Sequence, residues 1–231
     1  MISINPWAKM PTDWITDEKI KKFRFAEDGS TATAALLLFF VLCQTSTEHV
    51  LEENASMEVV RVATLTYDDM EKWASLSRAK VALGLKRLLD LKMISRIGTN
   101  RAGAYKVEGF EKGKRWAKLP GQALLSPAKT QFLPFTRFML RSRHEVNALK
   151  LHLYYASVRN KIHPHSEVSY ETIFEKTGVA ERDIPSANSL LLSTGLMHMI
   201  GRDKNEDVKQ YAANRYFMTG YKHLFILPKA E

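Results

Sequence analysis

The sequence predicts a mainly α-helical fold with small β hairpins, built from one structural unit that occurs twice. The string Trp-Ala-Lys-Met-Pro at 7–11 returns as Trp-Ala-Lys-Leu-Pro at 116–120. The hydrophobic positions of 66–94 then return at 169–197 without a gap, at an offset of 103 residues. Self-similarity of this kind indicates a duplicated supersecondary unit. The two expected domains of this α+β chain are residues 1–111 and 112–231.

The composition is typical of a globular protein with an anionic partner. Of the 231 residues, 45% are hydrophobic and 26% charged, and the formal net charge is +9. The pI of about 9.5 favours nucleic acid or a lipid surface as the partner. The one apolar run, Thr31 to Cys43, is shorter than the roughly 20 residues of a membrane-spanning helix, so we expect no membrane association.

The N-terminal residues and the cysteine usage both favour a cytoplasmic protein. Residues 1–22 lack the basic-then-apolar pattern of a secretory signal. The single cysteine, Cys43, excludes an intrachain disulfide and a multi-cysteine zinc site, and it suits a reducing compartment. We expect a buried Cys43 thiol and a location in the cytoplasm, at the nucleoid.

In the first copy, the pattern predicts three helices and three strands. Asp28 or Ser30 can cap the first helix, and Ser77 can cap the third. Thr66 starts the second helix, whose first turn holds two acids where the helix dipole favours them. The expected helices are 31–44, 67–74 and 77–91, and the expected strands are 59–65, 93–97 and 104–107.

The third helix of the first copy is predicted to bury one face and expose the other. Its apolar residues repeat at spacings of three and four. The residues expected on the buried face are Val81, Leu85, Leu88 and Leu89. Those left for the outside are Arg78, Lys80, Ala82, Lys86 and Arg87. Leu83 also lies in the outward half, where it can pack on a partner.

The second copy repeats the order of these elements. Pro185 is tolerated in the first turn of its third helix. The expected helices are 146–160, 170–176 and 184–193, and the expected strands are Val168, 196–201 and 215–218. The offset between the copies is 109 residues at the first string and 103 further on, so the first copy holds six extra residues. We expect them in a polar surface loop at 48–60.

A short helix, a tight turn, a second helix and a glycine-flanked hairpin loop at 98–103 predict a winged helix-turn-helix. The pattern Leu-Ser-Arg-Ala-x-Val-x-x-x-Leu-Lys-Arg-Leu-Leu-x-Leu-x-x-Ile at 76–94 resembles the recognition half of bacterial winged-helix DNA-binding domains. The fold expected for the whole chain is therefore mainly α with small β wings, as two tandem winged helix-turn-helix domains.

The charge gathers in the first copy. Residues 77–115 hold eleven basic and three acidic residues, whereas the matching residues 180–218 hold five of each. Cations on a recognition helix and wing suit DNA phosphates and base edges. A second group of basic residues surrounds the first helix of the second copy and could contact the DNA backbone. Equally, the second copy could provide a surface for a dimer or another partner. The residues expected to contact DNA are Ser77, Arg78, Lys80, Lys86, Arg87, Asn100, Arg101, Lys106, Arg141 and Arg143.

No catalytic or metal-binding pattern stands out in the sequence. There is no phosphate-cradling glycine loop and no nucleophile elbow. His163-Pro164-His165 is interpreted as a surface loop, because the two histidines of a metal motif should share one side of a strand. Trp7, Trp14 and Trp116 are interpreted as packing residues. We expect neither a cofactor nor an enzyme.

Two such domains in a basic chain of this length resemble the plasmid and phage replication initiators. The resemblance implies a sequence-specific binder of double-stranded DNA at an origin, with a second copy of the chain or a replication or transcription protein as partner. A transcriptional regulator is one alternative. A tandem winged-helix protein-interaction module is the other, although such a module does not need a concentrated positive surface.

Overall fold

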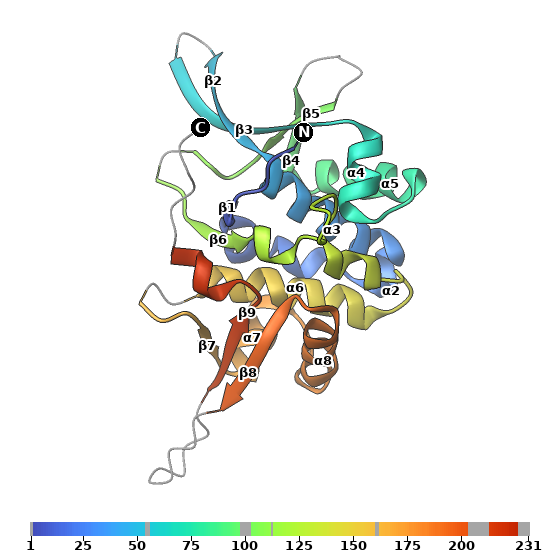
Figure 1. Cartoon of the computed structure of the whole chain (residues 1–231), viewed down its shortest axis with the longest axis vertical. Helices are drawn as coiled ribbons and strands as arrows, with labels where there is room; N and C mark the ends of the chain where they lie inside the picture. The colour runs from blue at the N-terminus through green and yellow to red at the C-terminus, as the bar shows by residue number, and fades with distance from the viewer. Residues whose placement is uncertain are drawn as a thin grey trace.

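Two helices, α3 (Ser30–Thr45) and α6 (Arg143–Ser157), pack against each other in the middle of the molecule. The computed structural model describes residues 2–53, 56–97, 103–111, 113–159, 162–202 and 213–225. A small antiparallel sheet lies toward each end of the molecule, with α4 and α5 at one end and α7 and α8 at the other (Figure 1). The expectation of an α+β fold with small sheets is confirmed.

The first half supplies five α-helices and five strands among the described residues, together with a short 3-10 helix at Lys19–Lys22. The helices are α1 (Asp13–Thr16), α2 (Phe25–Asp28), α3, α4 (Tyr67–Ala74) and α5 (Arg78–Asp90). The strands are β1 (Trp7–Pro11), β2 (Thr47–Glu53), β3 (Ser56–Leu65), β4 (Ile94–Ile97) and β5 (Gly103–Val107). Four of these strands form an antiparallel sheet in the order β2-β3-β5-β4.

From α6 onward the elements of the second half follow the order α3-β3-α4-α5-β4-β5 of the first half, which has α1, α2 and β2 in addition. Its helices are α6, α7 (Tyr170–Thr177) and α8 (Ile184–Thr194). Its strands are β6 (Trp116–Pro120), β7 (Ser166–Val168), β8 (Met197–Arg202) and β9 (Asn214–Met218). The last three form an antiparallel sheet in the order β7-β9-β8, which matches β3-β5-β4. Most predicted helices and strands agree with these bounds to within three residues.

The two copies of the repeated string pair with each other across the junction of the halves. Strands β1 and β6 are antiparallel, with Lys9 opposite Lys118 at the centre of the register. Trp7 stacks on Trp116, with ring centroids 5.9 Å apart and planes inclined by 8°. Each lysine lies over the tryptophan of the other strand, Lys9 at 5.3 Å and Lys118 at 4.1 Å from the ring centroid. The two strings therefore pack against each other; Trp7 is buried, as a packing residue should be, whereas Trp116 stays 45% exposed.

The expected loop at 48–60 is wrong, because most of it is paired β structure. Strand β2 pairs with β3 from Thr47 opposite Val62 to Glu53 opposite Ser56. Val50 and Val59 face each other on this ribbon, and β-branched residues favour extended backbone. The extra residues of the first half thus add a strand to the edge of its sheet.

Three smaller expectations also need correction. Leu89 is 37% exposed, and the buried face of α5 instead includes Gly84. Helix α3 begins after Gly29 and has no side-chain cap. Asp28 forms an ion pair with Arg87 at 2.9 Å instead. Ser77 does stand at the N-cap of α5, but its side chain makes no capping hydrogen bond.

The glycine in α5 lets that helix approach α3 closely. A β-carbon on Gly84 would lie 2.7 Å from Leu38 Cδ1 and 3.1 Å from backbone atoms of Ala34 and Ala35. A side chain at this position would displace the Leu38 methyl group and press on the α3 backbone, so glycine favours the close spacing of the two helices. The position of α5 on the body of the molecule depends on it.

One continuous hydrophobic core runs through both halves, from Ile4 to Leu224. Helix α3 is buried along almost its whole length, and burial raises the pKa of its Cys43 thiol. Helix α6 differs because it also buries Glu145, Lys150 and His152. Among the described residues, no helix has the length and apolar character needed to cross a membrane.

Candidate nucleic-acid interface

Helix α5 is held in place by a defined turn. Thr66 caps α4 in a reciprocal arrangement, since its hydroxyl accepts from the Asp69 N–H at 3.1 Å while the Asp69 carboxylate accepts from the Thr66 N–H at 3.0 Å. Ser75 ends α4 in the left-handed conformation, and α5 starts three residues later. The hydrophobic face of α5 then packs on α3 through Val81, Gly84 and Leu88. Its opposite face is left toward solvent.

The exposed face of α5 places two cations in line with a small residue. Arg78, Ala82 and Lys86 are exposed and follow each other at intervals of four residues. Residues four apart lie on the same side of a helix. Leu83 lies beside them and is 45% exposed. This face can donate hydrogen bonds at two levels and make apolar contacts between them.

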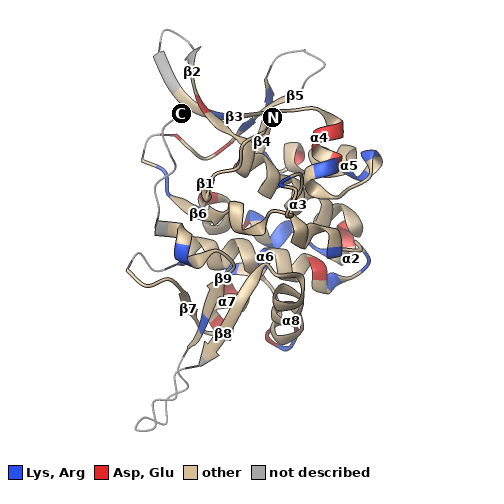
Figure 2. Ribbon diagram, in the orientation of Figure 1, with Lys and Arg blue, Asp and Glu red and all other residues tan. Residues whose placement is uncertain are grey.

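Arg78 is held by acids of the preceding helix. Its guanidinium lies 2.9 Å from an Asp68 carboxylate oxygen and 3.5 Å from one of Glu71, and 5.0 Å from the Tyr67 ring centroid. Figure 2 shows this basic start of α5 beside the acidic ribbon of α4. The Arg78 side chain stays 66% exposed, and pairs as exposed as Arg78 and Asp68 contribute little to stability. A phosphate or base edge can therefore replace these carboxylates.

Two of the predicted DNA contacts on α5 point back to the body of the protein. Lys80 is partly buried and donates to the hydroxyl of Ser30. Arg87 lies 2.9 Å from Asp28 and donates to the Lys22 carbonyl at 2.7 Å, with its side chain 23% exposed. These contacts fasten α5 to α2 and α3. Arg87 is thus poorly placed to reach a phosphate.

The other predicted DNA-contacting residues are spread over the molecule. Asn100 and Arg101, in the expected wing, lie outside the described residues. Lys106 is on β5, 3.7 Å from Glu108. Arg141 is exposed, and Arg143 forms an ion pair with Asp183 at 3.0 Å. The structure thus brings together Arg78 and Lys86 on one exposed helix face, with exposed Ser77 at the N-cap of the same helix, and not the two arginines of the second half.

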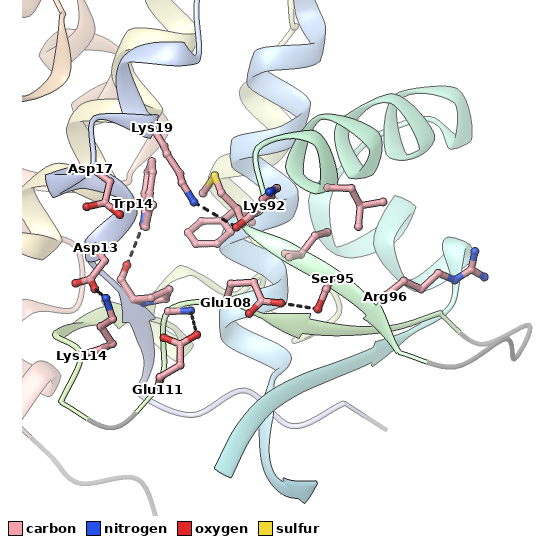
Figure 3. A pocket seen from close by; sticks show the side chains of 16 residues that line it. Asp13, Trp14, Asp17, Lys19, Lys92, Ser95, Arg96, Glu108, Glu111 and Lys114 are labelled. Carbon is pink, nitrogen blue, oxygen red and sulfur yellow. Dashed lines mark hydrogen bonds and ion pairs between the residues drawn. The ribbon is translucent and has the colours of Figure 1, made fainter. Parts of the chain in front are cut away.

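A cavity of about 590 Å³ lies between the N-terminal segment and the end of α5 (Figure 3). Its charged side chains are largely matched: Asp13 accepts from Lys114 at 2.8 Å, and Glu108 accepts from Ser95. Lys19 points across it to the Lys92 carbonyl. In the part of the chain that the structure describes, no cluster of three His, Cys, Asp or Glu residues could hold a metal. The cavity therefore lies where the N-terminal segment meets the end of α5, and these polar contacts join the surrounding elements.

A second cavity, of about 740 Å³, is lined by β6 and the end of α6. Its described charged residues are all basic: Lys114, Arg115, Lys118 and Arg159. The sequence analysis missed it because Lys118 and Arg159 are far apart in the chain. Trp116, interpreted as packing alone, also lines it and is 45% exposed.

Comparison with protein-family models, curated proteins and solved structures gave no match.

Proposed function

We propose that this protein binds double-stranded DNA in a sequence-specific manner, as two tandem winged helix-turn-helix units, with α5 as the helix that enters the major groove. The order of α4, α5, β4 and β5 supports this proposal, because a helix-turn-helix followed by a hairpin is the arrangement of a winged helix. Matching strand orders in the two halves support a duplication. The expected biological role is replication initiation on a plasmid, phage or other mobile element.

The observation that carries the proposal is the exposed line of Arg78, Ala82 and Lys86 on α5. An arginine can contact a guanine edge with two hydrogen bonds, and a small apolar side chain fits a thymine methyl group. Lys86 lies one helical turn after Ala82 on the same line, where it suits a phosphate. The opposite side of the helix is fixed to α3 by Gly84, so the exposed side chains are presented on a rigid element.

Selection of bound sequences from a random duplex library tests the proposal. We expect enrichment of a defined sequence, and the Arg78→Ala variant should weaken binding to it by about 10-fold or more. Recovered direct repeats would indicate an initiator, and a palindrome over a promoter would indicate a transcriptional regulator. The absence of any enrichment would contradict the proposal and favour a protein-interaction module.

A protein-binding role for the second half is a separate proposal, favoured by its exposed apolar residues. Leu192 on α8 is 41% exposed, Met199 on β8 is 44% exposed and Phe174 on α7 is 51% exposed. Helix α8 contains no charged residue, so it lacks the cations that a phosphate contact needs. A second copy of the chain or a replication or transcription protein would be the partner. Sedimentation of the wild type and of Leu192→Ser would test self-association.

A further inference from the structure

The basic cavity beside β6 is distinct from the exposed face of α5. Strand β6 supplies Lys118 and the exposed indole of Trp116, and the segment directly after α6 supplies Arg159. Arg115, directly before the strand, is exposed at the cavity. None of the described lining residues is an aspartate or glutamate.

The two central cations are placed close enough to affect each other. Burial lowers the pKa of Lys118, and the nearby charge of Arg159 lowers it further. Burial also lowers the pKa of Arg159. Like charges held together at a partly buried place raise the free energy of the empty site, and an anion between them lowers it.

Lys114 differs from Lys118, because Asp13 pairs with it at 2.8 Å. The informative comparison is with Lys9, which faces Lys118 in the β1–β6 register. Lys9 donates to the Glu48 carboxylate at 2.8 Å, and Glu48 comes from the strand that only the first half has. Lys118 has the Trp7 ring at 4.1 Å, and no ion pair joins it to a described carboxylate. Of these two lysines, Lys9 is thus neutralised by a carboxylate, whereas Lys118 lies against an aromatic ring.

We propose that this cavity is a phosphate-binding site for a nucleotide, with Lys118 and Arg159 holding the phosphate, Arg115 at the rim and the Trp116 indole beside the base. The volume of about 740 Å³ is within the range of small-ligand pockets. Cations next to an exposed aromatic ring match the two parts of a nucleotide, since phosphates need positive charge and bases stack on aromatic rings. The ligand is a free nucleotide or one nucleotide of a nucleic-acid strand.

This site does not depend on α5 binding duplex DNA, so the two proposals can fail separately. Calorimetric titration of the full chain with inorganic pyrophosphate, thymidine triphosphate and a short oligothymidylate tests it. We expect saturable one-to-one binding of thymidine triphosphate, tighter than that of pyrophosphate. A still tighter oligothymidylate identifies a strand as the source, and an equal or weaker one identifies the free nucleotide.

Matched variants separate the cavity from general charge. Lys118→Gln and Arg159→Gln should each weaken nucleotide binding by about 10-fold or more, whereas Lys72→Gln should change it less than about twofold. Lys72 is exposed on α4 and does not line the cavity, and thermal melting of all three variants checks that they fold. No saturable binding at about 1 mM ligand, equal effects of Lys72→Gln and Lys118→Gln, or equally tight binding of polyglutamate would each overturn the proposal.

Discussion

Helices α5 and α8 hold corresponding places in the two halves, yet α5 exposes basic side chains and α8 contains no charged residue. At the offset of 103 residues, buried Val81 corresponds to buried Ile184 and Leu88 to Leu191. Exposed Arg78 corresponds to exposed Glu181, and exposed Lys86 corresponds to exposed Ser189. The similarity lies in positions that make the core, and the difference lies in positions that meet a partner.

This difference indicates that the first half carries the proposed DNA contact. Helix α8 has no cation that could pair with a phosphate, and Glu181, just before it, would repel one. Helix α5 instead offers two exposed cations on one line. A shared element order therefore does not imply a shared function for the two halves.

The close approach of α5 to α3 should make Gly84→Val the most damaging of these changes. The counterpart in the second half is Ala187, which is also buried. Valine at 84 would overlap Leu38 and the α3 backbone, so we expect a loss of about 3 kcal/mol in the free energy of unfolding. Chemical denaturation measures this loss. Ala82→Val, on the exposed side of the same helix, is the control, and an equal effect of both would contradict the packing argument.

Acid sensitivity should come from α6 and not from α3. Burial lowers the pKa of His152 from 6.5 to about 4, and the ring lies against Phe40. The unfolded chain therefore takes up the proton first, and stability should fall as the pH drops from 6.5 toward 4, by up to about 3 kcal/mol. Unfolding measured at several pH values should show a weaker dependence for His152→Leu. An unchanged dependence would contradict this assignment.

The contacts of Arg87 predict a structural role, in contrast to the role predicted for Arg78. Arg87→Ala leaves partly buried Asp28 without this ion pair, which should cost about 2 kcal/mol of stability. Its duplex DNA affinity should stay within about twofold of the wild type. Melting and DNA titration of the same preparation test both statements. A large loss of affinity without loss of stability would return Arg87 to the DNA interface.

The acids of α4 should weaken DNA binding by competing for Arg78. Asp68→Asn removes one of them at a fully solvated position, so we expect affinity for duplex DNA to rise by about threefold. Glu181→Gln in the second half should have no such effect. Fluorescence anisotropy can resolve this change, and a decrease in affinity for Asp68→Asn would mean that Arg78 must stay paired to be positioned.

The sequence predicted the helices well, because their signals are local. The bounds of α4 follow directly from Thr66, the acids after it and the apolar spacing. The start of α8 was indicated by Pro185, which suits a first turn. Repetition of these signals at a fixed offset also located the strands around them.

The partners of side chains and edge strands were not predictable, because they depend on residues distant in the chain. Strand β2 looked like a polar loop until its pairing with β3 was known. Arg87 and Lys86 are neighbours in sequence, but only Arg87 meets Asp28. Likewise, nothing in the string around Lys118 indicates that Arg159 lies across the same cavity.

The salt dependence of duplex binding tests the central contrast between α5 and α8 most directly. Each phosphate contact contributes about 0.9 to the slope of log affinity against log salt. With Lys86 at a phosphate and Arg78 at a guanine edge, the double variant Arg78→Ala/Lys86→Ala should bind more weakly with a slope shallower by about 1, and Ser189→Ala should match the wild type. An unchanged slope and affinity for the double variant would contradict the assignment of DNA binding to α5.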